Sequence, residues 1–65
     1  MCESNVYMIG KDGKEKLCME SVDRITPVDD GIILENIFSE TKKVHAKIKE
    51  MALVSHRIVL EEQAD

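Results

Sequence analysis

Short clusters of β-branched and apolar residues, separated by polar turn signals, constrain the fold of this chain more than any other feature. Of its 65 residues, 15 are Val, Ile or Thr, which suit the pleated surface of a strand. The clusters recur at intervals of about 8 to 15 residues, a spacing typical of small all-β sandwiches and barrels. We therefore expect an all-β domain.

The clearest turn signal is Asp12-Gly13, between two segments that alternate in polarity. This dipeptide favours a two-residue hairpin loop, because both central positions of a type I′ turn need a positive φ. Centring the hairpin there places apolar side chains on one face, as a half-buried sheet requires. The pairs predicted on this face are Met8–Leu17 and Val6–Met19, and Tyr7–Cys18 is predicted on the opposite face.

A second turn, Asp29-Asp30-Gly31, joins predicted strands over residues 22–28 and 32–38. Gly31 suits the left-handed position of a three-residue loop. Pro27 has no backbone donor, so it should lie at a sheet edge or a strand end.

A third hairpin is predicted with Ser55-His56 in its loop, pairing Leu53 with Ile58. The apolar alternation changes parity within residues 48–50, which predicts a β-bulge near Lys49. Five short strands joined by tight turns then indicate a small, strongly bent, five-stranded SH3-like or Sm-like barrel.

A helix over the same region is the alternative. Val44, Ile48, Met51 and Ala52 are also spaced as on one helical face, with Ser39 available as an N-cap. The β-branched residues and the apolar pairing across the third turn favour strands.

The length allows one domain, residues 1–65. Its core is too small for a large enclosed active site, and a chain of this size is often stabilised by a second subunit. With 13 acidic and 9 basic residues, the net charge of −4 disfavours nucleic acid. The longest apolar run, residues 51–54, is too short to span a membrane. We expect a cytoplasmic protein with reduced thiols and a solvated tail over residues 61–65.

The two cysteines should act separately. Their spacing fits no zinc or redox motif, and the hairpin register puts their α-carbons roughly 16 Å apart, beyond the reach of a disulfide. Cys18 is expected to be a small hydrophobic residue.

Cys2 is the candidate metal ligand. If the initiator Met is removed, one residue carries a free α-amine and a thiol, which together form a five-membered chelate suited to Ni(II), with Cu(II) as a competitor. One chain offers too few donors, so a two-fold dimer would be needed to complete the site. A solvated terminal cysteine is the alternative.

The remaining polar residues have simple structural roles. His45 should be solvated, His56 should lie in a turn, and Asp29 and Asp30 should form a turn. A lysine stripe lacks the aromatic partners that stack bases and is expected to be a solvated face; it comprises Lys42, Lys43, Lys47 and Lys49. No nucleophile has a base and an orienting group, so we expect no enzymatic activity.

The whole chain resembles a known family. The matching segments are Met1-Cys2, Lys11-Asp12-Gly13, Glu20-Ser21-Val22-Asp23, Gly31-Ile32-Ile33-Leu34 and Arg57-Ile58-Val59-Leu60-Glu61-Glu62. Their order is similar to that of the CooT family of small nickel-binding proteins. The resemblance implies a homodimer that binds Ni(II) through Cys2 of both subunits and assists nickel insertion into carbon monoxide dehydrogenase. The family has also been labelled RNA-binding, an analogy with Sm proteins.

Three functions are therefore weighed: a nickel-binding accessory protein, an RNA-binding Sm-like module, and a protein-interaction domain without a ligand. The resemblance favours the first, with a nickel enzyme as the client. The acidic charge disfavours the second.

Overall fold

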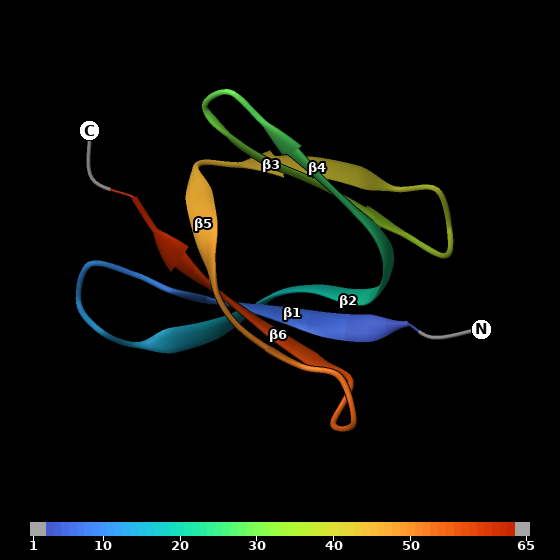
Figure 1. Cartoon of the computed structure of the whole chain (residues 1–65), viewed down its shortest axis with the longest axis horizontal. Helices are drawn as coiled ribbons and strands as arrows, with labels where there is room; N and C mark the ends of the chain where they lie inside the picture. The colour runs from blue at the N-terminus through green and yellow to red at the C-terminus, as the bar shows by residue number, and fades with distance from the viewer. Residues whose placement is uncertain (1–2, 64–65) are drawn as a thin grey trace.

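The computed structural model describes residues 3–63 and shows six strands in a single sheet (Figure 1). The strands are β1 (Ser4–Ile9), β2 (Glu15–Val28), β3 (Gly31–Asn36), β4 (Thr41–Val44), β5 (Ala46–Ala52) and β6 (Arg57–Glu62). Their order in the sheet is β4-β3-β2-β1-β6-β5. All neighbouring strands are antiparallel except β1 and β6, which are parallel. No helix that could cross a membrane occurs in residues 3–63.

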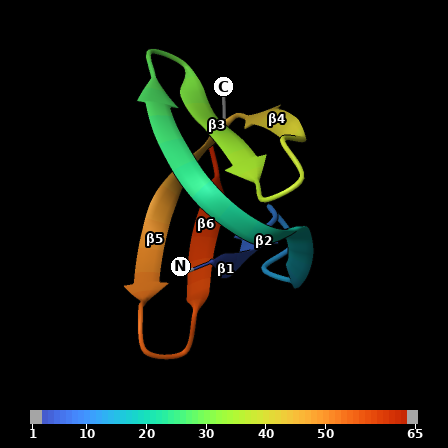
Figure 2. The ribbon, with the colours of Figure 1, turned by 90° about the vertical axis from the view of Figure 1, so that its right-hand side faces the viewer.

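The long strand β2 gives the sheet its curvature. Its first half pairs with β1 and its second half with β3, and Ser21 between them has a φ of 55°. The register also shifts between Val22 and Arg24, as at a bulge that bends a strand. The sheet therefore curls until β3 contacts β5 (Figure 2), although the edge strands β4 and β5 do not close the ring.

The concave side of the curled sheet holds the core. Every strand contributes to it, and Leu34, Leu60 and Val6 are fully buried. The eight-residue cluster is Val6, Val22, Ile32, Leu34, Val44, Ala46, Ile58 and Leu60. The all-β, barrel-like class expected from the sequence is confirmed, with six strands instead of five and an open sheet.

The first hairpin differs from the prediction near its turn. The loop spans residues 10–14, closed by a hydrogen bond from Gly10 N to Lys14 O of 3.1 Å. Tyr7 consequently pairs with Leu17 and Met8 with Lys16, so the predicted Tyr7–Cys18 and Met8–Leu17 pairs are wrong. The register shifts at Cys18, as in a bulge, which restores the predicted pairing of Val6 with Met19.

The second turn is also tighter than predicted. β2 runs to Val28 and β3 begins at Gly31, so only Asp29 and Asp30 form the loop. Gly31 pairs with Val28 and does not have a positive φ. A glycine is needed at this position because there is no room for a side chain: a Cβ would lie 2.2 Å from the Val44 backbone oxygen. Pro27 is next to last in β2, near a strand end as expected.

Residues 46–52 form a strand, so the alternative helix is wrong. The predicted irregularity is confirmed, because the β5–β6 register shifts between Ile48 and Glu50. The third turn is longer than predicted, with residues 53–56 in the loop and Met51 paired with Ile58. A bend at His45 separates β4 from β5, and this break adds the sixth strand.

The prediction of a solvated tail is wrong for Glu61 and Glu62, which belong to β6. β6 continues through Glu62, and Gln63 N donates a 3.1 Å hydrogen bond to the His45 backbone oxygen. Residues 61–63 are therefore tied to the bend between β4 and β5.

Candidate functional site

The parallel pairing of β1 with β6 fixes the position of the start of β1. Asn5 lies opposite Arg57, and Asn5 N donates a 2.9 Å hydrogen bond to the His56 backbone oxygen. The start of β1 is thus held against the loop between β5 and β6. His56 occupies the left-handed region in this loop, with a φ of 53°.

Two more segments join the same end of the molecule. Ser21 N, at the bend of β2, donates to Asn5 Oδ1 over 3.2 Å, and Ile37 N donates to the Ser21 backbone oxygen over 3.0 Å. Hydrogen bonds therefore connect the β3–β4 turn, the bend of β2, the start of β1 and the β5–β6 loop. We call this region, marked by Asn5, Ser21, Ile37 and His56, the N-terminal end; Figure 2 faces it.

A surface hollow lies at the N-terminal end, lined by Glu3, Asn5, Ser55 and His56. Cys2, the predicted metal ligand, is outside the described residues and directly precedes Glu3. Its role stays a prediction. The hollow supplies a carboxylate and an imidazole near the start of the chain, and both are chemically suited to assist a thiolate-bound divalent ion.

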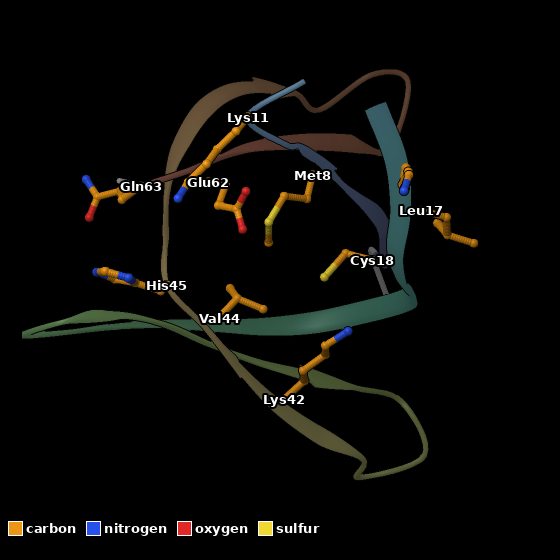
Figure 3. A pocket seen from close by; sticks show the side chains of 10 residues that line it. Met8, Lys11, Leu17, Cys18, Lys42, Val44, His45, Glu62 and Gln63 are labelled. Atoms are coloured by element: carbon orange, nitrogen blue, oxygen red, sulfur yellow. The ribbon is translucent and has the colours of Figure 1, made fainter. Parts of the chain in front are cut away.

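A second hollow lies at the other end of β1 and contains the sulfur atoms of Met8 and Cys18 (Figure 3). Met8, Cys18 and Val44 point into it, while His45 lies on its rim. Cys18 is a free thiol, packed against the core as expected of a small hydrophobic residue. No cluster of three or more His, Cys, Asp or Glu side chains suited to a metal occurs between residues 3 and 63.

The two histidines are therefore separated by the fold. His56 lies in a turn, as predicted, and reaches the N-terminal end, whereas His45 is exposed at the bend after β4. The proximity of His56 to the start of the chain was missed from the sequence, because only the parallel pairing of β1 with β6 reveals it.

The lysine stripe is partly neutralised. Lys43 Nζ lies 2.9 Å from Asp30 Oδ1, and Lys47 Nζ lies 3.7 Å from Glu61 Oε1. The hydrogen bond from Lys43, together with its positive charge, lowers the pKa of Asp30. The stripe therefore presents less positive potential than four lysines suggest.

The convex side of β1 carries a further charged contact. Arg57 stacks over the Tyr7 ring, 4.2 Å from its centroid, and its guanidinium pairs with Glu15. The hydrogen bond to Glu15 raises the pKa of Arg57. The Arg57 guanidinium therefore covers one face of the Tyr7 ring.

Comparisons with known proteins agree over nearly the whole chain. The family model described as CO dehydrogenase accessory protein CooT matches residues 1–61. The crystal structure of a protein assigned as CooT from Carboxydothermus hydrogenoformans is similar with a TM-score of 0.87 and 44% identity, covering 97% of this chain and 100% of that one. An uncharacterised protein from Methanothermobacter thermautotrophicus is 39% identical over 61 residues, covering 94% of this chain and 89% of the relative. The resemblance noted in the sequence is thus confirmed, and the chain belongs to the CooT family of CO dehydrogenase accessory proteins.

Proposed function

We propose that this protein is a nickel-binding accessory protein that binds Ni(II) through Cys2 of both subunits of a homodimer. The observation that carries the proposal is the match of the CO dehydrogenase accessory family to a chain whose second residue is a cysteine. The protein acts in the cytoplasm and assists the maturation of a nickel enzyme such as CO dehydrogenase. It has no catalytic activity of its own.

The donor chemistry supports Ni(II) as the cargo. A thiolate and an α-amine on one residue are strong-field donors, and two copies supply enough of them for a square-planar ion. The hollow is lined by His56 and by Glu3, the residue that follows Cys2 in the sequence. Both ligand groups must lose a proton to bind, so affinity should rise with pH.

The test is a nickel titration followed by thiolate-to-nickel charge-transfer absorption. We expect one ion per two chains for the parent protein and loss of the high-affinity site in Cys2→Ser. Cys18→Ser is the matched control and should bind as the parent does, because Cys18 lies in the other hollow. Parent-like affinity in Cys2→Ser would show that the site is elsewhere.

A second variant tests the amine. One extra residue ahead of Cys2 removes the α-amine from the chelate but spares the thiol. We expect weaker binding and an altered charge-transfer band. An unchanged titration would remove the amine from the ligand set.

A further inference from the structure

Three lysines line the hollow shown in Figure 3. The hollow has a volume of about 400 Å³, a size typical of small-molecule sites. Lys11, Lys16 and Lys42 line it together with a single carboxylate, that of Glu62. With His45 neutral, its lining therefore has a formal charge of +2, although the whole chain has a net charge of −4. Positive charge is concentrated here on an acidic protein.

Two of these lysines lie on the concave side of the sheet, where the core forms. Lys16 pairs with Met8, whose side chain packs against the core, and directly paired residues share a face. Lys42 is two residues before the buried Val44 on β4, so these two side chains also share a face. Figure 3 shows Lys42 extending toward the hollow. The core side of a half-buried sheet is ordinarily apolar, so lysines on it need a physical explanation.

None of the three lysines forms an ion pair between residues 3 and 63. Four of the nine Lys and Arg side chains in this range pair with a carboxylate, namely Arg24, Lys43, Lys47 and Arg57. Of the five that have no such partner there, three line this hollow. All three are exposed, so their ammonium groups remain hydrated and available to an anion from solution.

Protection of a sheet edge is the alternative explanation. A charged side chain that points inward from an edge strand discourages pairing with another chain, and β4 is an edge strand. This explains Lys42. It does not explain Lys11, which lies in the loop before β2 and outside every strand, or the apolar side chains that point into the hollow between the lysines.

The lining combines positive charge with apolar surface. Met8, Cys18 and Val44 point into the hollow, where they can contact an apolar group. Lysine ammonium groups bind phosphate and carboxylate oxygens as flexible point charges. A lining charge of +2 favours a ligand with two negative charges, and burial of an apolar group adds affinity that an inorganic anion cannot gain.

We propose that this hollow binds a small organic dianion, a phosphate monoester or a dicarboxylate with a short apolar body. Lys11, Lys16 and Lys42 hold the negative charges, and the apolar body lies against Met8 and Val44. The site needs no nickel, so it is independent of the proposed function. Because the lysines are exposed, affinity falls as the salt concentration rises.

The experiment is a ligand titration of the full chain, followed by amide NMR spectra at slightly alkaline pH. Phenyl phosphate and glutarate are the dianions, inorganic phosphate is the anion without an apolar body, and benzyl alcohol is the neutral probe. Lys16→Met and Lys42→Met each remove one charge from the hollow. Lys49→Met is the matched control, because Lys49 has no ion pair between residues 3 and 63 and does not line the hollow. Ligand-free spectra confirm that each variant folds.

We expect a dianion to give saturable shifts at Met8, Cys18 and Val44. Inorganic phosphate and benzyl alcohol should bind more weakly than that dianion. Lys16→Met and Lys42→Met should each weaken binding about fivefold, the effect of one exposed charge pair, and Lys49→Met by less than about twofold. Binding of either dianion supports the proposal, and the tighter one identifies the anionic group.

Three results would overturn the proposal. The absence of saturable shifts with both dianions would remove the site. Equal affinity for inorganic phosphate or for benzyl alcohol would show that the hollow does not select an organic anion. An equal loss in Lys49→Met would show that the overall charge of the protein, and not this hollow, attracts the ligand.

Discussion

Gly31 lies so close to β4 that no side chain fits there. A Cβ would approach the Val44 backbone oxygen to 2.2 Å, and a backbone atom in a paired strand cannot easily move away. We expect Gly31→Ala to lower the free energy of unfolding by about 1–3 kcal/mol, measured by urea denaturation.

Gly10→Ala is the control for this substitution. The nearest atom to its Cβ is Asp12 Oδ1 at 3.2 Å, the end of a flexible side chain. Its unfolding free energy should change by less than about 1 kcal/mol. Equal losses in both variants would contradict the steric explanation.

Asp30 illustrates a single-residue electrostatic effect. Lys43 lowers its pKa in the folded protein from 3.8, so the ion pair contributes stability above the ordinary carboxyl pKa. That contribution is lost as the pH falls through the lowered, folded-state pKa. A carboxyl NMR titration should show the Asp30 pKa returning toward 3.8 in Lys43→Met. In Lys42→Met the Asp30 pKa should stay lowered. If it also returned toward its ordinary value there, the shift would come from the overall positive charge of the lysines and not from the contact with Lys43.

At the scale of elements, the β3–β4 turn depends on one buried polar side chain. Asn36 is 6% exposed, and its Oδ1 accepts hydrogen bonds of 3.0 Å from Phe38 N and Glu40 N. Asn36→Ala leaves both donors without this partner, and we expect a loss of about 1–3 kcal/mol in urea unfolding.

The matched control acts on the other side of the same contact. Asn36 Nδ2 donates to Glu40 Oε1 over 2.7 Å, and the amide oxygen of Gln can accept the same bond. Glu40→Gln should therefore cost less than Asn36→Ala. The reverse order would mean that the carboxylate, not the asparagine, stabilises the turn.

The elements show which parts of the fold the sequence can specify. Local turn chemistry correctly located the hairpin at Asp12-Gly13, and the parity change correctly located the irregularity near Lys49. The bulge at Cys18 was not predictable from the sequence. The alternation of polar and apolar residues does not give the length of the loop, and the loop length sets the register of the paired strands. The pairing of β1 with β6 depends on contacts between distant residues, and it alone brings His56 to the N-terminal end.

At the scale of the whole molecule, the charge distribution predicts weak RNA binding. The net charge is −4, and two of the four stripe lysines are paired with carboxylates. A gel-shift series should show binding that disappears between low and physiological salt. Tight binding at physiological salt, lost on replacing Lys42, Lys43 and Lys47, would favour the RNA-binding alternative.

The parallel contact between β1 and β6 also has a consequence for synthesis. A ribosome releases β1 before β6, and the β1–β2, β2–β3 and β3–β4 pairings can form in between. Because this pairing closes a loop of nearly the whole chain, it must be among the last and slowest contacts to form. Until β6 has been synthesised, β1 therefore keeps one unpaired edge, and such an exposed edge is prone to aggregation.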